Sequence, residues 1–291
     1  MQIKATKESS LSDLLLAEFK TASRSMVKKI ILHGSVTING NKISIPGTLL
    51  QPGDVVEYIK HKAQPGSSNA PFPVIFEDES LLVVEKPAGI LTHAEKGTTG
   101  TSLYKEMLEY IKERSKGKER IYVVHRLDRE VSGIVLFVKN EHVQEQIKAN
   151  WRETTKRYWA LVHGSPEKEA GTLESWLIEG RDQKMFSVKQ NEDAKQAITH
   201  YKTSKKLGDL TLLDVELETG RKNQIRVQLS DIGCPVVGDW RYGSKDNVKR
   251  RIRLHAYYFS MNHPVTGQFL EFSSRMPRGF MTLGDKEEKY K

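Results

Sequence analysis

The stretch that decides the fold is His125-Arg126-Leu127-Asp128-Arg129-Glu130-Val131-Ser132-Gly133, which continues directly into the apolar run of residues 134–138. A short continuous apolar run after a glycine is typical of a buried strand. Asp128 is therefore expected in a loop at the mouth of a strand, with Arg126 and Arg129 beside it. Two fixed positive charges favour the ionised form of a carboxylate. A carboxylate held in this way beside phosphate-binding arginines is a candidate nucleophile acting on a nucleic acid.

Strand and helix patterns extend from this loop in both directions without a regular alternation. Strands are predicted at residues 81–85, 121–124, 157–162, 198–201, 210–217 and 269–272. Helical periodicity covers residues 103–111, the Val143, Ile147 and Trp151 series, and residues 224–229 after the Thr219-Gly220 turn. This mixture predicts an α+β fold with a mixed, largely antiparallel central sheet.

Residues 1–62 predict a separate small α/β module. Its helix begins after the candidate N-cap Ser23 and ends near Gly34, with an apolar series between them formed by Met26, Val27, Ile30 and Ile31. Asn39-Gly40 between two short strands is a strong hairpin signal, and residues 55–59 predict a further strand.

Arg24, Lys28 and Lys29 lie on the opposite face of this predicted helix, and residues 1–62 contain nine Lys or Arg against five Asp or Glu, a net charge of +4. Such a face is either an ordinary solvated helix surface or a contact for a polyanion. The hairpin and the motifs further along the chain favour RNA contact, by backbone and shape rather than by base readout.

Residues 63–73 contain three prolines, one glycine and no charge, which is typical of an exposed linker. This linker divides the chain into the module of residues 1–62 and a larger domain of residues 74–280. Residues 281–291 are rich in charge and predict a solvated tail.

The totals restrict the class of protein. Among 291 residues, 46 Lys or Arg face 37 Asp or Glu, and the resulting charge of +9 indicates a polyanion partner. No basic amphipathic helix with an aromatic apolar face stands out, and the apolar runs are far shorter than the ~20 residues that span a bilayer, so we expect no membrane partner. Cys234 is the single cysteine, which excludes an internal disulfide and a multi-cysteine zinc site. We expect a cytoplasmic monomer, without a secretory signal.

Five motifs in order resemble the RluA-type pseudouridine synthases, over about residues 74–280. The motifs are residues 83–89 (VVEKPAG), 125–133, 156–162 (KRYWALV), 219–227 (TGRKNQIRV) with 233–239 (GCPVVGD) and 242–243, and 254–256 with 263–267 (HPVTG). The N-terminal module resembles the small RNA-binding module named after ribosomal protein S four, which commonly precedes the catalytic domain in that family.

This resemblance implies a mixed sheet with a catalytic cleft, and the isomerisation of specific uridines to pseudouridine in structured RNA by base flipping. Large-subunit ribosomal RNA is the leading substrate candidate. The reaction is redox-neutral and needs neither a metal nor an organic cofactor. By the resemblance, Asp128 is the catalytic aspartate, Arg226 its basic partner and Tyr158 the active-site tyrosine.

The remaining matched positions imply contacts with RNA. Arg126 corresponds to the arginine that enters the space left by the flipped base, and Leu254 to an apolar residue of the pocket. Arg129, Arg221 and Lys222 are candidate phosphate contacts. Val131, Asn223, Gln228 and Cys234 stand where the family commonly has other residues.

Each of these residues also has an ordinary structural interpretation. Taken alone, Asp128 is a turn carboxylate, Arg226 a surface arginine and Tyr158 a core tyrosine. His125 and His255 are expected to be structural hydrogen-bonding groups, and Trp159 to pack on the face of its strand opposite Tyr158. Two other functions remain open: a non-catalytic RNA-binding protein for ribosome assembly, and a glycosyl hydrolase. A hydrolase needs a second carboxylate, for which Glu130 is the nearby acid.

Overall fold

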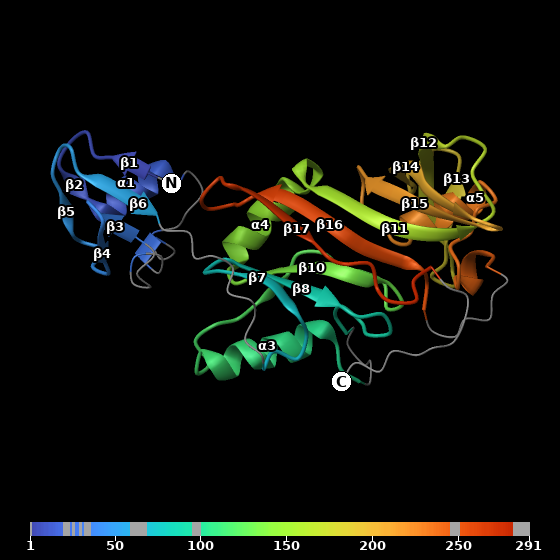
Figure 1. The fold of residues 1–291 in the computed structure, drawn as a ribbon, viewed down its shortest axis with the longest axis horizontal. Coiled ribbons are helices and arrows are strands. Elements are labelled where there is room, and N and C mark those ends of the chain that lie inside the picture. Colours follow the sequence, from blue (N-terminus) through green and yellow to red (C-terminus); the bar gives the residue numbers. More distant parts are fainter. Residues whose placement is uncertain are drawn as a thin grey trace.

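The computed structural model describes residues 2–19, 24, 27–28, 31, 36–58, 69–94, 100–244 and 251–281. Figure 1 shows the N-terminal elements as a compact group of their own beside a larger α+β body. Within the described ranges no helix is long and apolar enough to cross a membrane.

The N-terminal group contains a four-stranded antiparallel sheet in the order β1-β6-β3-β4. Its elements are β1 (Gln2–Lys4), β2 (Ser9–Ser10), α1 (Leu11–Glu18), β3 (Val36–Ile38), β4 (Asn41–Ile43), β5 (Leu49–Leu50) and β6 (Val55–Tyr58). The predicted hairpin is confirmed as β3–β4, because Asn39 and Gly40 both adopt positive φ, 52° and 84°, as a two-residue type I′ turn requires.

The basic helix is described only in part. Val27 and Ile31 are helical and buried, whereas Arg24 and Lys28 are helical and exposed, as the apolar periodicity predicts. Lys29, together with Ser23, Met26, Ile30 and Gly34, lies outside the described residues, as do residues 63–68 of the predicted linker.

The larger body is built on an eleven-stranded sheet whose main path runs β13-β12-β14-β15-β11-β16-β10-β8-β7, with β17 paired to β16 and β9 to β10. Among the described pairings β10–β16 is the parallel one and the others are antiparallel, which confirms the mixed, largely antiparallel sheet. The strands are β7 (Val74–Glu77), β8 (Leu81–Lys86), β9 (Tyr122–Val123), β10 (Ser132–Val138), β11 (Thr155–His163), β12 (Ala170–Glu179), β13 (Met185–Val188), β14 (Lys195–Leu207), β15 (Leu210–Leu217), β16 (Leu254–Asn262) and β17 (Phe269–Ser273).

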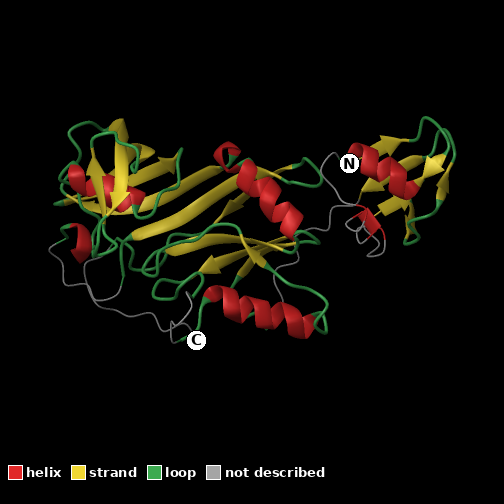
Figure 2. Cartoon of the chain, turned by 180° about the vertical axis from the view of Figure 1, so that it is seen from behind, coloured by secondary structure: helices red, strands yellow, loops and turns green. Residues whose placement is uncertain are grey.

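Two helices cover opposite faces of the β8–β10 part of the sheet. The buried residues of α3 (Leu103–Arg114) pack with Leu82 and Val135, and those of α4 (Glu141–Ala149) pack with Leu81 and Ile134. Neighbouring residues of a strand point to opposite faces, so both faces of these strands are apolar. Figure 2 shows the two helices from behind.

Trp151 does not continue α4, contrary to the spacing-based prediction. The helix ends at Ala149, and Trp151 opens the 3-10 turn η1 (Trp151–Glu153). Its ring stacks on Phe259 and contacts His125 at a tilt, at centroid distances of 5.7 and 5.0 Å, so the apolar position serves the sheet core rather than a longer helix.

A single row of paired residues across the sheet joins three strands that carry sequence motifs, β10, β16 and β11. Gly133 of β10 pairs with Ala256 of β16, and Ala256 pairs with Tyr158 of β11. Gly133 has φ 123°, and a Cβ there would lie 2.2 Å from the Ala256 carbonyl oxygen, so only glycine permits this close parallel pairing. The β11–β16 register shifts between Arg157 and Tyr158, a bulge that re-aims the tyrosine.

Candidate active site

The loop that carries Asp128 is clamped to the segment that follows β8. Lys86 is fully buried, and its Nζ donates to the carbonyl oxygens of Pro87, Ile90 and Arg129 at 3.0, 2.7 and 3.1 Å. Burial lowers the pKa of Lys86 to about 7. The Lys86 amine therefore joins the segment after β8, through Pro87 and Ile90, to the Asp128 loop, through Arg129.

A second pair of contacts fixes the residue before Asp128. Thr92 Oγ1 donates to the Leu127 carbonyl oxygen at 2.8 Å and accepts from the Leu127 N–H at 3.0 Å. On the other side of Asp128, the Arg129 Nε donates to the Gly89 carbonyl oxygen at 3.1 Å. The backbone of Asp128 is therefore held from both sides.

Asp128 and Arg226 form the ion pair expected across 98 residues of sequence, with Arg226 Nη1 2.8 Å from Asp128 Oδ2. The Arg226 side chain is 8 % exposed and that of Asp128 is 28 % exposed. Arg226 lies in the first turn of α5 (Gln224–Asp231), and its Nη1 also donates to Asn223 Oδ1 at 3.1 Å. Arg226 is thus a buried arginine, not a surface one, and it leaves one edge of the carboxylate toward solvent.

The bidentate partner of Arg226 is Asp239, which the sequence reasoning missed. Arg226 Nε lies 2.5 Å from Asp239 Oδ2, and Arg226 Nη2 lies 2.9 Å from Asp239 Oδ1. Asp239 is 1 % exposed. The one available signal was its place as the acid of the matched motif at residues 233–239, but nothing local indicates its partner.

Tyr158 lies beside Asp128 in a small inner cavity of about 70 Å³. The apolar lining of this cavity comes from Leu127, Val131, Leu217, Ile225 and Leu254, and three arginines and two amide side chains also line it: Arg126, Arg221, Arg226, Asn223 and Gln224. Burial raises the pKa of Tyr158, and the charge of Asp128 raises it further, so the phenol is protonated at neutral pH. Apolar side chains on one wall, with a phenol hydroxyl, a carboxylate and the polar groups of α5 on the other, suit a pyrimidine ring and its carbonyl and N–H groups.

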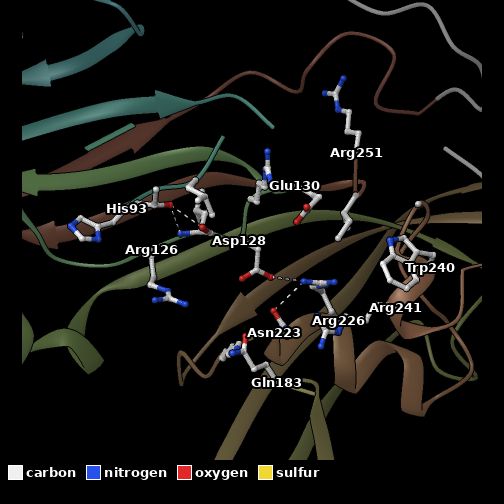
Figure 3. Close-up of a pocket in the computed structure, with 17 residues that line it drawn as sticks. His93, Arg126, Asp128, Glu130, Gln183, Asn223, Arg226, Trp240, Arg241 and Arg251 are labelled. Carbon is white, nitrogen blue, oxygen red and sulfur yellow. Dashed lines mark hydrogen bonds and ion pairs between the residues drawn. The ribbon is translucent and has the colours of Figure 1, made fainter. Parts of the chain in front are cut away.

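A larger outer cleft of about 490 Å³ opens on the other side of Asp128. Six cationic residues line it, against two acids: Arg126, Arg129, Lys222, Arg226, Arg241 and Arg251, with Asp128 and Glu130. Figure 3 shows the Asp128 carboxylate between these side chains, with Arg126 directed away from it on one side. Asp128 lines both cavities, so it stands where the cationic cleft meets the smaller cavity of Tyr158.

The predicted RNA-contact residues that the structure describes lie in the outer cleft, in the inner cavity and on the N-terminal module. Arg126 and Arg129 are exposed in the outer cleft. Lys222 also lines that cleft but forms an ion pair with Glu179, and Arg221 lines the inner cavity with its Nε donating to the Gln196 carbonyl oxygen at 3.0 Å. Arg24 and Lys28 are exposed on the N-terminal module.

The residues predicted to be structural are structural. His125 Nε2 accepts from the Leu136 N–H at 3.0 Å, and His255 lies between Ser132 and Ser274 at 2.9 and 3.1 Å. Burial lowers the pKa of each ring to about 4. Trp159 stacks on Tyr257 at 4.3 Å between centroids, in a cluster separate from that of Tyr158.

Three of the positions that depart from the family pattern have clear surroundings here. Asn223, in the left-handed conformation at φ 54°, binds Arg226 through its Oδ1 and Tyr242 through its Nδ2. Gln228 Nε2 donates to carbonyl oxygens of β12 and β14 through Leu173 and Ala197. Cys234 is buried. Within the described residues, no group of three or more His, Cys, Asp or Glu side chains is arranged to hold a metal ion.

Comparison with known proteins points in one direction. Residues 80–231 match the family model described as RNA pseudouridylate synthase, and residues 11–56 match the S4 domain. An uncharacterized RNA pseudouridine synthase of Aquifex aeolicus is 33 % identical over 95 % of this chain and 93 % of its own length. Ribosomal large subunit pseudouridine synthase D of Yersinia pestis is 31 % identical over 93 % of this chain and 89 % of its own. The solved structure of human RNA Pseudouridylate Synthase Domain Containing 4 has a TM-score of 0.59 at 25 % identity, over 71 % of this chain and 89 % of its own.

Proposed function

Because the chain belongs to the RNA pseudouridylate synthase family, we propose that it isomerises specific uridines of structured RNA, with large-subunit ribosomal RNA as the substrate. The supporting observation is the position of Asp128, held by Arg226 at 2.8 Å where the cationic cleft meets the inner cavity that Tyr158 and Leu254 line. A polyanionic backbone fits the first cavity and a flipped pyrimidine fits the second.

The reaction breaks the C1′–N1 glycosidic bond of uridine and forms a C1′–C5 bond, with loss of the proton from C5 and gain of one at N1. It changes neither mass nor oxidation state. A carboxylate is required at the sugar or the ring, and the detached uracil must be retained while it turns. Asp128 supplies the carboxylate, and the walls formed by Val131 and Leu254 retain the ring.

Arg226 orients the carboxylate of Asp128. One hydrogen bond from Arg226 engages Oδ2, and Oδ1 accepts no hydrogen bond from the described residues. A carboxylate with one satisfied and one open oxygen is oriented without being blocked. The open oxygen is the one we assign to the nucleotide.

Tyr158 acts as a neutral phenol. Because burial raises its pKa, the hydroxyl keeps its proton and can donate a hydrogen bond to the base. Its ring forms one face of the base pocket. Arg126, exposed at the cleft, fills the gap in the RNA stack that the flipped uridine leaves, and its planar cation partly offsets the few kcal/mol that flipping costs.

The module of residues 1–62 supports a large folded RNA as substrate. It matches the S4 domain over residues 11–56 and exposes Arg24 and Lys28. The Yersinia pestis relative is named for the large ribosomal subunit. We assign phosphate contacts to Arg24, Lys28, Lys29, Arg129, Arg221 and Lys222, and the chain acts as a cytoplasmic monomer.

The test is a map of pseudouridines in RNA from cells with and without this chain, followed by treatment of the deficient RNA with purified protein. The expected result is one or a few uridines that regain an isomer of unchanged mass. Asp128→Asn should abolish the conversion while RNA affinity stays within about twofold. Glu130→Gln is the matched control, because Glu130 lines the same cleft and should be dispensable.

Two outcomes would reject the proposal. Release of free uracil, lost in both Asp128→Asn and Glu130→Gln, would indicate a hydrolase that uses two carboxylates. RNA that binds but is never modified would indicate a non-catalytic assembly protein.

A further inference from the structure

Trp240 is the most exposed large apolar side chain among the described residues, at 81 %. It opens the 3-10 turn η2 (Trp240–Tyr242) and lines the outer cleft that Asp128 also lines. A fully exposed indole is uncommon on a folded protein, because its large apolar surface contacts water. Nothing in the proposed chemistry of Asp128, Tyr158 and Arg226 requires it.

The backbone under Trp240 is fixed from both sides. Asp239 directly before it binds Arg226 through two hydrogen bonds. Two residues later, Tyr242 is 5 % exposed, and its hydroxyl accepts from the Met185 N–H and from Asn223 Nδ2, both at 3.0 Å. Trp240 is therefore presented at a defined place relative to the ion pair, and its exposure is not that of a loose loop tip.

Gly238 completes this anchoring. It has φ 81°, and a Cβ there would lie 2.3 Å from the Arg251 carbonyl oxygen, so the two segments that meet at the cleft approach as closely as backbone allows. Arg241 Nη2 donates to the Asp182 carbonyl oxygen at 2.6 Å, which ties η2 to the β12–β13 turn. Contacts at Gly238, Asp239, Arg241 and Tyr242 thus hold this short segment in place. Trp240 is its solvent-facing aromatic residue.

The surroundings of Trp240 are cationic. Lys222, Arg241 and Arg251 line the same cleft, and Figure 3 shows Trp240 on the side of Asp128 opposite Arg126. Aromatic side chains interleaved with cations are the pattern by which proteins hold single-stranded nucleic acid, since bases stack on the ring and phosphates meet the charges. An apolar protein partner would instead favour a continuous apolar patch, whereas most residues that line the cleft are polar or charged.

We propose that Trp240 is a stacking platform for an unpaired RNA base next to the target nucleotide. The inference rests on the proposed function, because it places that base in the cleft leading to Asp128. When a uridine leaves the stack, its neighbour loses a stacking partner. Arg126 fills the gap toward one flanking base, and Trp240 stacks on the flanking base on the opposite side of Asp128. The contact serves binding and does not take part in the chemistry.

The experiment compares Trp240→Ala and Trp240→Phe with Phe269→Ala, a matched control at an aromatic that is 57 % exposed on β17 and lines neither cavity at Asp128. The binding probe is a fluorescein-labelled ten-residue oligouridylate. We expect Trp240→Ala to weaken binding by roughly five- to a hundredfold, the range for one base stacked on an aromatic. Trp240→Phe should weaken it by less than about threefold, and Phe269→Ala should not change it.

Indole fluorescence is the readout that a structural role would not change. The chain has four tryptophans, and Trp151, Trp159 and Trp176 are half-buried. Unlabelled oligouridylate should quench the wild-type emission, and Trp240→Phe should remove most of that quenching. In pseudouridine formation on RNA from deficient cells, Trp240→Ala should raise KM and leave kcat unchanged.

Unchanged affinity in Trp240→Ala, or quenching that persists in Trp240→Phe, would overturn the proposal. A loss of self-association in sedimentation, with RNA affinity intact, would instead assign Trp240 to a contact with a second copy. If the wild-type protein forms no pseudouridine, the proposed function fails. The oligouridylate measurements still decide whether Trp240 stacks on a base.

Discussion

Arg226 lies between Asp239 and Asp128, and its guanidinium divides its donors unequally between the two carboxylates. Nε and Nη2 bind Asp239 in a bidentate pair, whereas Nη1 alone reaches Asp128. Asp239 is the more buried carboxylate. The bidentate pair of Arg226 with Asp239 therefore lies inside the protein, and the single hydrogen bond of Arg226 to Asp128 lies at the cleft. A bidentate pair fixes the plane of a guanidinium, which makes Asp239 a positioning residue for Asp128.

Asp239→Asn should therefore lower kcat about 10- to 100-fold while the affinity for RNA stays nearly constant. Without the second carboxylate the guanidinium is free to rotate, and a displacement of about 1 Å at a reacting group costs roughly a hundredfold in rate. Asp239→Glu, which keeps the charge, should recover part of the loss. The measurement is single-turnover pseudouridine formation with saturating protein.

The matched control for Asp239 is Asp214→Asn. Asp214 forms an ion pair with Arg157 and accepts from the Tyr257 hydroxyl at 3.0 Å, and it lines neither cavity at Asp128. Both variants should lose stability, because each removes one carboxylate partner from an arginine. An equal fall of kcat in both would show that Asp239 acts only on stability.

Tyr158→Phe should reduce the rate by about 10²- to 10⁴-fold, the usual range for removal of a general acid or base. Burial raises the pKa of Tyr158, so the group lost is a neutral hydroxyl. The ring remains, and the fold should be retained. Quench-flow kinetics on RNA from deficient cells would measure the effect.

Tyr201→Phe provides the comparison for that variant. Tyr158 and Tyr201 both pair with Val215, from β11 and β14 respectively, so they lie in one row of the sheet. Tyr201 does not line the inner cavity. If Tyr158→Phe is as active as Tyr201→Phe, the Tyr158 hydroxyl takes no part in the reaction and Tyr158 serves only in packing.

The stability of the protein should fall as pH drops from about 6.5 to about 4. The pKa of His125 and that of His255 are about 4 in the folded chain, lowered by burial from 6.5. In that window the unfolded chain binds protons that the folded chain does not, so acid favours unfolding. Each ring contributes up to about 3 kcal/mol of lost stability at the acid end.

Guanidinium titrations at a series of pH values would measure this loss. His125→Gln retains an acceptor for the Leu136 N–H and removes one titrating group. Its free energy of unfolding should therefore depend on pH about half as steeply over the window. A slope equal to that of the wild type would mean that His125 is protonated in the folded chain.

The double variant Arg24→Gln with Lys28→Gln should bind structured RNA more weakly and with a smaller dependence on salt. Each lost phosphate contact lowers the slope of log affinity against log salt by about 0.7 to 0.9. The expected decrease is therefore about 1.5, with kcat unchanged at saturating RNA.

The matched control is Lys205→Gln with Lys206→Gln, which neutralises two exposed cations near the end of β14. Gln196, whose carbonyl oxygen binds Arg221 beside the site, lies near the start of that strand. It removes the same charge from the chain. If both double variants change the slope equally, the N-terminal module contributes only net charge, not a binding face.

Strong local patterns were sufficient to predict β10, β15, α3 and the β3–β4 hairpin, because each is specified by neighbours in the chain. The strands β12 and β13 gave no such signal. Residues of β12 are mostly exposed or half-buried, so its composition lacks the apolar alternation that marks a strand. The resemblance of the motifs paired Asp128 with Arg226, but no local pattern indicates which second acid completes the triad.

The sequence by itself determined the motifs, the α+β class and the residues from which a site could be built, since these depend on residue type and short-range order. Tertiary structure alone decided that Asp239 forms an ion pair with Arg226 and that Trp240 lines the cleft. It also decided that one row of the sheet joins Gly133, Ala256 and Tyr158. Such contacts join residues far apart along the chain. Their geometry follows from strand register and packing, which no window of sequence contains.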